Sequence, residues 1–459
     1  MPFFIKEKTK KKKNNKRARN VENGPNKKRK LERESEEEIT TSEDEGTALN
    51  GDLFNSNSED EDESPQDKKL RLAKIYLQEI EQREKEKLGE NEEVDNRLIS
   101  KRLNEDYLKE IGKFKSNVAE NYSEDKIEKI DTLKCRQQKE SITCLCLSSK
   151  NDYLFTGSKD GTVVKWNIEL KKKEKMIPFV KLESDKISGH SKAITSIAIS
   201  FDDKYLAVGD ESSEIKIWCP KNLSFVKKFN GHNKKITGVS FRKNSHTLYS
   251  CSADRTVKVW NLDEMMYIET LFGHQDVITS IDSLYKERAI TSGSRDGTLR
   301  IWKIPEESQL IYNGHAGCID IVKLINEENF ISGGEDGKIC IWSLMRKKPL
   351  FIIHDAHGKD PLNQEPNWIS SIATLVNTDL FASGSFNGFV KLWKLTSNFK
   401  RAELLFDIPQ VGYINSMAFT SNGDKLIVST SRDHKFGRYT FLEGQKIKNC
   451  IKVISFNKK

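Results

Sequence analysis

The sequence has no run of about 18 consecutive apolar residues, so it predicts no helix that crosses a membrane. Its start, Met-Pro-Phe-Phe-Ile, is too short for the apolar region of a secretory signal. The eight cysteines form no Cys-x-x-Cys pair and show no zinc-type spacing. Because most of them stand within apolar runs, we interpret them as reduced core residues of an intracellular protein, not as disulfides or metal ligands.

The common signatures of cofactor and substrate sites are also missing. There is no Gly-x-Gly-x-x-Gly motif, no Walker loop and no metal-spaced pair of histidines. We therefore predict no cofactor, no metal ion and no small-molecule substrate, and no membrane partner. All seven tryptophans lie beyond position 165, so the packed core is expected in the later part of the chain.

The N-terminal part carries two blocks of opposite charge. Residues 1–31 hold 13 Lys or Arg and a net charge of +11, whereas residues 32–64 hold 14 Asp or Glu and a net charge of −13. Such blocks repel themselves and cannot bury a core, so we predict a disordered tail over residues 1–63. Two basic clusters are typical of a nuclear import signal: Lys10, Lys11, Lys12, Lys13, Lys16 and Arg17, then Lys27, Lys28, Arg29 and Lys30. Binding of RNA by the same charges, or a merely solubilising tail, are the alternatives.

Residues 64–120 have a helical pattern. Ser64 and Pro65 suit a helix start, and apolar residues then recur at three- and four-residue steps from Leu70 to Ile80. A second apolar stripe runs from Leu98 to Phe114. Neither helix is long enough to be stable alone in water, so each stripe needs a surface on the neighbouring domain or on a partner.

From residue 138 the chain repeats a pattern that ends in tryptophan. The repeats end at Trp166, Trp218, Trp260, Trp302, Trp342 and Trp393, and a seventh ends in Phe-Gly-Arg-Tyr439. Successive spacings are 52, 42, 42, 40, 51 and 46 residues, and Gly-His occurs near the start of four repeats. Periods of about 40–45 residues with these markers indicate a β-propeller.

Each repeat contains short alternating strands bounded by Asp, Gly and Asn, so the predicted fold is all-β, a seven-bladed propeller over residues 127–456. Closing the ring removes the exposed sheet edges of an open array. We expect the segment Ile127–Leu133 to supply the outer strand of the last blade. The C-terminal run Ile451–Phe456 competes for that role.

These repeats resemble the WD-repeat family, whose blades contain a hydrogen-bonded tetrad of His, Ser or Thr, Asp and Trp. Three blades match this pattern in full: His232, Ser250, Asp254 and Trp260; His274, Ser292, Asp296 and Trp302; and His315, Ser332, Asp336 and Trp342. The other blades depart from it, with Gln138 in the first, Val208 and Ser212 in the second, Glu365 and Asn387 in the sixth, and Gln410 and Tyr439 in the seventh. We expect blades 2, 6 and 7 to be less tightly held.

The Ser, His and Asp of one blade are the residue types of a hydrolase catalytic triad. They recur blade after blade beside a tryptophan, whereas catalysis needs one exposed nucleophile and an oxyanion site. The pattern therefore favours structure over catalysis, and we predict that the protein is not an enzyme.

In the family, three positions per blade point to the rim of the narrow face, where partners bind. In this sequence they are Trp368, Ser370, Phe386, Tyr413, Asn415 and Arg432 in blades 6 and 7, Lys235, Thr237, Thr279 and Arg295 in blades 3 and 4, and Asp320 and Glu335 in blade 5. We predict that Trp368, Phe386, Tyr413, Arg432, Arg295 and Lys235 bind RNA or a partner. For Trp368 the alternative is packing beneath the insertion at residues 354–367.

Outside the repeat positions, the sequence resembles the family of U3 small nucleolar RNA-interacting WD-repeat proteins. The resemblance rests on residues 64–77, 102–108, 269–276, 303–310, 367–371 and 434–439 and covers about residues 64–456. It implies a component of the U3 ribonucleoprotein in the nucleolus that binds the B/C motif of U3 RNA together with the kink-turn-binding protein. It also implies a scaffold role in the small-subunit processome, among other processome proteins, during pre-rRNA processing toward 18S rRNA. A nuclear propeller that reads protein peptides, as a chromatin or degradation adaptor, is the alternative.

Overall fold

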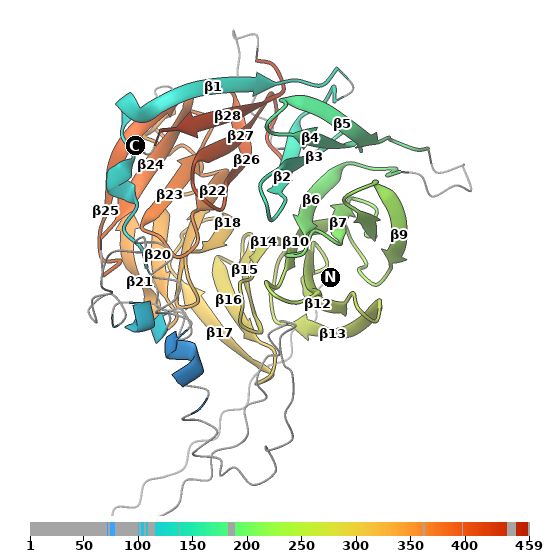
Figure 1. Cartoon of the computed structure of the whole chain (residues 1–459), viewed down its shortest axis with the longest axis horizontal. Coiled ribbons are helices and arrows are strands. Elements are labelled where there is room, and N and C mark those ends of the chain that lie inside the picture. Colours follow the sequence, from blue (N-terminus) through green and yellow to red (C-terminus); the bar gives the residue numbers. More distant parts are fainter. Residues whose placement is uncertain are drawn as a thin grey trace, which may run out of the picture. The chain divides into compact units, whose positions relative to one another are not determined.

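A computed structural model gives the fold of the chain (Figure 1). It describes residues 71, 74–78, 100, 102–104, 107–108, 115–136, 138–181, 189–360, 363–396, 398–437 and 447–457. The predicted tail and import signal lie outside these residues. Within the predicted helical segment, the described residues from Arg71 to Leu108 have helical backbone conformation.

The described strands form seven four-stranded antiparallel sheets, which Figure 1 shows arranged around one axis. The first four blades are β2(Ile142–Leu147), β3(Tyr153–Ser158), β4(Val163–Asn167), β5(Lys172–Ile177); β6(Ile194–Ile199), β7(Leu206–Asp210), β8(Ile215–Cys219), β9(Ser224–Phe229); β10(Ile236–Phe241), β11(Thr247–Ser252), β12(Thr256–Asn261), β13(Met266–Phe272); and β14(Ile278–Asp282), β15(Arg288–Gly293), β16(Thr298–Lys303), β17(Ser308–Asn313). The others are β18(Ile319–Leu324), β19(Asn329–Gly334), β20(Ile339–Ser343), β21(Arg346–Ile353); β22(Ser371–Thr374), β23(Leu380–Gly384), β24(Phe389–Leu395), β25(Ala402–Pro409); and β26(Tyr413–Phe419), β27(Lys425–Ser431), β28(Cys450–Phe456), β1(Ile127–Leu133). The predicted seven-bladed propeller is confirmed.

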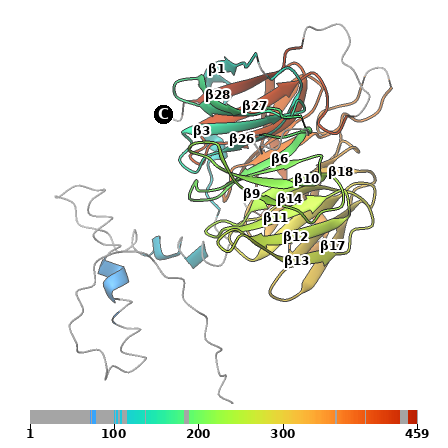
Figure 2. The same cartoon turned by 90° about the vertical axis from the view of Figure 1, so that its right-hand side faces the viewer.

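Within each blade the first strand lies at the axis and the fourth at the outside (Figure 1). Figure 2 shows the same ring from the side. The core lies between the blades, because the second and third strands are buried on both faces. In the third blade, for example, Trp260 of β12 and Leu248 of β11 pack against Ile236 and Phe229 at the boundary with the second blade. Burying such side chains contributes about 1.5–3 kcal/mol each, so every blade depends on its neighbours.

Both terminal segments build the seventh blade. β1 pairs with β28 in antiparallel register, with Ile130 opposite Ile454, and β28 pairs with β27. The expectation that Ile127–Leu133 forms the outer strand of this blade is therefore confirmed, and the competing run Ile451–Phe456 lies in the third strand instead. The sequence assigned the third strand of the seventh blade to a repeat that ends at Tyr439, which lies outside the described residues. That assignment is corrected, because β28 is the third strand of this blade. The chain turns away at His434–Phe436 and resumes the blade only at Cys450.

A short segment before β1, residues 118–126, connects the closing blade to its neighbour and is called the strap below. It contains two 3-10 helices, η2(Ala119–Asn121) and η3(Glu124–Lys126). The backbone N–H groups of Val118 and Ala119 both donate to the buried carboxylate of Asp379, at 2.7 and 2.9 Å. The Tyr122 hydroxyl donates to the carbonyl of Gly423 at 2.6 Å. The strap thus joins the turns between first and second strands in blades 6 and 7.

Candidate functional site

The tetrads of the third and fifth blades form continuous hydrogen-bonded chains. In the third blade, Nε1 of Trp260 donates to the Ser250 hydroxyl at 2.8 Å, and Nε2 of His232 lies 2.8 Å from the same oxygen. Nδ1 of His232 lies 2.9 Å from the carboxylate of Asp254. In the fifth blade, Trp342, Ser332, His315 and Asp336 make the same contacts at 2.8, 2.7 and 3.0 Å. Each hydrogen-bonded tetrad fixes a loop at one face of the ring to a buried strand.

The fourth blade corrects one tetrad residue. Nε1 of Trp302 donates to the Thr291 hydroxyl at 2.9 Å, and His274 lies 2.8 Å from that oxygen, so Ser292 is not the third member. Strand β15 pairs Ala289 with Trp302, which places Thr291 two residues later on the same face. Ser292 points to the other face and contacts the Thr279 hydroxyl at 2.9 Å. An extra residue between β15 and Asp296 accounts for the shift.

The second and sixth blades are better connected than their sequences suggested. In the sixth blade the histidine is His357 and not a residue at Glu365; it lies 2.8 Å from Ser383, which Trp393 also contacts, and 3.1 Å from Asn387. In the second blade Val208 offers no hydroxyl, so Nε1 of Trp218 donates directly to His190 at 3.2 Å, and His190 contacts Asp210 at 2.9 Å. The expectation of looser sixth and second blades missed these two networks.

The first and seventh blades have partial networks. Gln138 replaces histidine and donates to the Thr156 hydroxyl at 3.3 Å, while Trp166 donates to the same oxygen at 3.0 Å. In the seventh blade, Ser429 donates to the carbonyl of Ser416 instead. Gln410 is buried, and its side-chain amide has no hydrogen-bond partner among the described residues. The seventh blade has other links instead, through the pairing of β1 with β28 and the bond from Tyr122 to Gly423.

Electrostatics in the tetrads fit a structural role. Burial lowers the pKa of His190 and His274, and it lowers the pKa of His357 to about 4. Burial works to raise the pKa of Asp254, but hydrogen bonds from His232 and Thr256 outweigh it, and the pKa is lowered. A neutral buried histidine that already contacts a hydroxyl and a carboxylate has no open position for a substrate.

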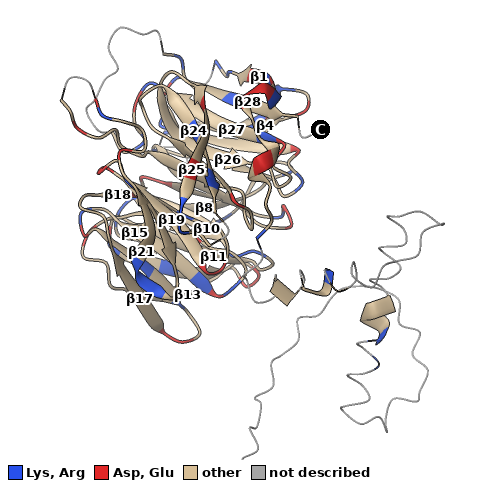
Figure 3. Ribbon diagram, turned by 90° about the vertical axis from the view of Figure 1, so that its left-hand side faces the viewer, with Lys and Arg blue, Asp and Glu red and all other residues tan. Residues whose placement is uncertain are grey.

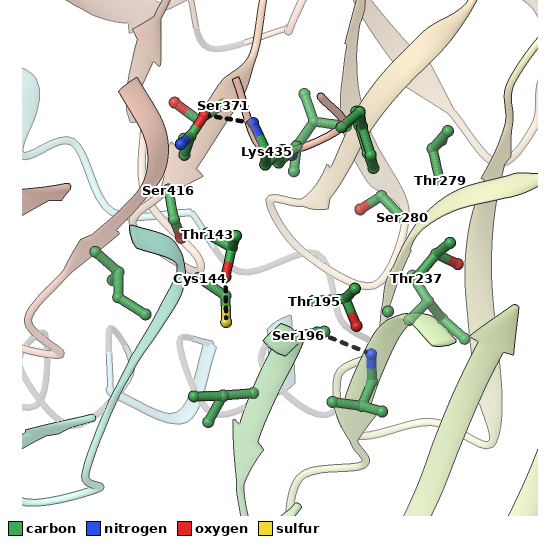
Figure 4. Close-up of a pocket in the computed structure, with 18 of the residues that line it drawn as sticks. Thr143, Cys144, Thr195, Ser196, Thr237, Thr279, Ser280, Ser371, Ser416 and Lys435 are labelled. Carbon is green, nitrogen blue, oxygen red and sulfur yellow. Dashed lines mark hydrogen bonds between the residues drawn. The ribbon is translucent and has the colours of Figure 1, made fainter. Parts of the chain in front are cut away.

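Polar side chains of the inner strands line the axial channel, which holds a cavity of about 140 Å³. Figure 4 shows Thr143, Thr195, Thr237 and Thr279 around it, each on a different inner strand. Thr143 donates to the carbonyl of Ile194 in the next blade at 2.7 Å. The corresponding residues of blades 6 and 7 act alike: Ser370 donates to Ile414 at 2.6 Å, and Asn415 donates to Ile142 at 2.9 Å. These bonds join neighbouring blades around the channel.

These inter-blade bonds around the channel, called the belt below, change the interpretation of several rim positions. Thr237, Thr279, Ser370 and Asn415 were expected at the rim, and Asp320 with them, but all five are buried. The hydroxyls and the amide serve contacts within the ring, as Thr279 does toward Ile319. The exposed part of the predicted site therefore lies elsewhere.

Aromatic rings gather between blades 6 and 7. The ring of Trp368 lies edge-on to that of Phe386, with centroids 5.9 Å apart, and 6.2 Å from the ring of His434. Phe386 in turn lies 5.6 Å from Tyr413. Trp368 and Phe386 are half-buried, whereas Tyr413 is 0% exposed. The expected contact role of Tyr413 is thus corrected, because its ring supports the cluster from within and offers no free face.

Sequence reasoning missed three members of this region, His434, Lys435 and Phe436. The Lys435 backbone N–H donates to the Asn415 side chain at 2.9 Å, which turns the segment toward the channel mouth (Figure 4). The Lys435 ammonium lies 5.0 Å from the centre of the Phe436 ring. The Lys159 ammonium donates to the His434 carbonyl at 2.7 Å. The signal was present, since residues 434–439 carried part of the family resemblance, but it was read as a strand end.

The predicted basic residues are exposed but separated. Arg432 follows β27 beside the aromatic cluster, and its backbone N–H donates to Asn449 at 2.9 Å. Lys235 lies in blade 3, 3.7 Å from Glu211, and Arg295 lies in blade 4. All three stand in turns that open at the same face, because loops entering first strands and turns between second and third strands share one end of a blade. Figure 3 shows that Lys and Arg also lie on several strands, among them β21.

Comparison with known proteins places the chain in a family. The family model described as WD domain, G-beta repeat matches residues 128–167, 183–219, 223–261, 266–303, 306–343 and 360–394. The human protein named U3 small nucleolar RNA-interacting protein 2 is 44% identical over 393 residues, which are 85% of this chain and 82% of that protein. The chain belongs to the family of U3 small nucleolar RNA-interacting WD-repeat proteins. A U3 snoRNP-associated protein-like protein of Arabidopsis thaliana is 31% identical, over 82% of this chain and 83% of its own length.

Solved structures agree with this family assignment. The chain superposes on the structure of U3-55K with a TM-score of 0.68 at 43% identity, over 71% of this chain and 98% of the other. The crystal structure of the RRP9 WD40 repeats gives the same TM-score and identity over 72% and 97%. Within the described residues of this U3 family member, no helix is long and apolar enough to span a membrane. Nor do His, Cys, Asp and Glu side chains in that part of the chain cluster as a metal site.

Proposed function

We propose that the protein is a component of the U3 small nucleolar ribonucleoprotein that binds the B/C motif of U3 RNA and acts as a scaffold in the small-subunit processome. Its relatives in human and mouse carry names that state an interaction with U3 small nucleolar RNA. A Saccharomyces cerevisiae relative, 27% identical over 165 residues, is named ribosomal RNA-processing protein 9. These names support a role with U3 RNA in ribosomal RNA processing. The finer parts of the proposal are pre-rRNA processing toward 18S rRNA, a place in the nucleolus, and the kink-turn-binding protein and other processome proteins as partners.

The aromatic cluster at blades 6 and 7 is the proposed RNA contact. Unpaired bases stack on aromatic side chains, and Lys and Arg neutralise phosphates. Here the half-buried Trp368 contacts Phe386 and also His434, which is followed by Lys435 and stands two residues after the exposed Arg432. This combination of rings and cations at one face is the observation that carries the proposal. Lys235 and Arg295 would contact the RNA backbone farther around the same face.

The mechanism would be recognition of shape without chemical turnover. The tetrads and the belt hold the loops at fixed positions, so the ring presents a surface whose ordering costs little on binding. The Ser, His and Asp side chains of the tetrads are occupied with one another, which supports a non-catalytic role. The basic N-terminal clusters would direct the chain to the nucleus.

Binding to a fluorescent U3 B/C RNA, with the kink-turn-binding protein present, tests this proposal. Trp368→Ala should weaken binding about tenfold through lost stacking of one base, worth about 1–3 kcal/mol. Arg432→Ala should weaken it and lower the salt slope by about 0.7–0.9, as expected for one lost phosphate contact. Leu404→Ala, on the exposed outer strand β25, is the matched control.

Two results would contradict the proposal. If the wild-type chain does not prefer B/C RNA over an unrelated RNA of equal length, the U3 function fails. If the wild type binds but Trp368→Ala and Leu404→Ala behave alike, only the site assignment fails. Stable protein partners that resist nuclease, with no enriched RNA, would favour the peptide-reading scaffold.

A further inference from the structure

The outer strand of the third blade, β13, is unusually apolar for an exposed edge. Met266, Tyr267, Ile268 and Phe272 are between 48% and 71% exposed. β13 ends the sheet order β10-β11-β12-β13, so in the described structure its outer side has no strand partner. Edge strands are usually protected by charged side chains, above all lysine.

Three other outer strands of this ring have that protection, and β13 does not. β5, β9 and β21 each carry at least two Lys or Arg, whereas β13 carries none. The neighbouring outer strand β17 also carries none and exposes Ile311. The outer strand β25 has no Lys or Arg either, but it carries two acidic residues. β13 and β17 lie side by side at the lower edge of the ring in both Figures 1 and 2. An exposed apolar area of this kind is typical of a protein interface.

Two carboxylates belong to the same surface. Oε1 of Glu269 on β13 is buried and has no hydrogen-bond partner among the described residues. Burial raises the pKa of Glu269, and the negative charge of Glu307, just before β17, raises it further. Two lysines on the adjacent strands β12 and β16 are engaged elsewhere: Lys258 donates to the Thr270 hydroxyl and Lys303 to Glu306, each at 2.6 Å. A cation placed between Glu269 and Glu307 would therefore be stabilised.

We propose that this surface is the docking site for a basic, apolar segment of a partner protein. The β13 surface comprises Met266, Tyr267, Ile268, Glu269, Phe272, Glu307 and Ile311. One Lys or Arg of the partner lies between the two glutamates, and apolar side chains on either side of it cover Ile268 and Phe272. Charge complementarity decides the occupant, because a phosphate backbone would meet two carboxylates here. The site is separate from the proposed RNA contact and does not depend on it.

Photo-crosslinking in the native cell tests this docking site with the full chain. A benzoyl-phenylalanine replaces Phe272, and in a control chain it replaces Phe389, which is 41% exposed on β24. Crosslinked peptides are identified by mass spectrometry after nuclease treatment. The same experiment is repeated with Glu269→Lys and Glu307→Lys together, and with Glu403→Lys on β25 as the matched charge control.

The expected result is one predominant crosslinked segment that contains Lys or Arg between apolar residues and resists nuclease. Its yield should fall at least tenfold in the double lysine variant and stay unchanged in the Glu403→Lys chain. Glu307→Lys alone, at an exposed position, should lower the yield without changing the melting temperature. This single variant separates loss of docking from any destabilisation by Glu269→Lys at its half-buried position. A yield equal to that of the Phe389 control, retention in the double variant, or crosslinks to RNA, to a second copy or to this chain's own N-terminal segment would each overturn the proposal.

Discussion

Asp379 lies 2.9 Å from the backbone nitrogen of Ala119, a residue 260 positions earlier in the chain. Its carboxylate also accepts the N–H of Val118 and is 1% exposed. The carboxylate of Asp379 in the sixth blade thus holds the strap together with the bond from Tyr122 to Gly423 in the seventh blade.

Replacement of Asp379 by Ala should destabilise the ring. Two hydrogen bonds to a charged acceptor are lost, each worth about 1.5–3 kcal/mol, and two backbone N–H groups lose their partner. We expect a loss of about 3 kcal/mol in the free energy of unfolding, measured by urea denaturation. Glu403→Ala, which removes an exposed carboxylate on β25, is the control. Equal midpoints for the two variants would show that the strap does not depend on Asp379.

The second prediction concerns the fourth blade, where Thr291 and not Ser292 belongs to the tetrad. Thr291→Ala removes the oxygen that both His274 and Trp302 contact, so two buried donors lose their partner. We expect it to cost about 2 kcal/mol more than Ser292→Ala, whose hydroxyl contacts only Thr279. Denaturation of both variants measures the difference. The reverse order would restore Ser292 to the tetrad.

The buried histidines should make stability depend on pH. The pKa of His357 is about 4 in the folded chain, below its ordinary value of 6.5, so the unfolded chain binds more protons between these values. The contribution of His357 is present above pH 6.5 and is lost as the pH falls toward 4, by up to about 1.4 kcal/mol per pH unit.

Denaturation midpoints at pH 7 and pH 5 test this dependence. His357→Gln, which keeps hydrogen-bonding groups but cannot bind a proton in this range, should reduce the difference between the two midpoints. His190 and His274, whose pKa values burial also lowers, should leave a remaining dependence. An unchanged difference in the His357→Gln chain would contradict the assignment of His357 to a neutral, buried position.

Thiol reactivity should follow burial. Burial raises the pKa of Cys144, Cys251 and Cys340 to about 12, so few thiolates form at neutral pH. We expect iodoacetamide to modify the half-buried Cys219 before these three in the native chain, and all of them equally in urea. Peptide mass spectrometry measures the order. Early modification of Cys251 would show that the third blade opens more readily than its tetrad suggests.

The tryptophan spacing predicted the blades because each tryptophan ends a third strand at a constant place. The same reasoning failed where the chain length between strands changes. His357 was missed because an insertion separates it from β22, and Thr291 was missed because one extra residue precedes Asp296. Position alone predicts a register only when loops have standard lengths.

Burial was the second quantity that the sequence could not supply. Tyr413 and Trp368 both occupy rim positions of the repeat, but Tyr413 is fully buried and Trp368 is half-buried. His434 lies against both rings, with centroids 6.2 Å from Trp368 and 6.0 Å from Tyr413. No local pattern in the sequence predicts where the segment His434–Phe436 packs.

The pairing of β1 with β28 has a consequence for how the protein is made. A ribosome completes β1 before any other strand of the ring, and β28 after all of them. Six blades can be assembled during synthesis, while β1 waits for β28, the last strand of the ring to be made. A nascent chain therefore exposes an unpaired strand throughout translation, and a message truncated before residue 450 yields a ring that never closes.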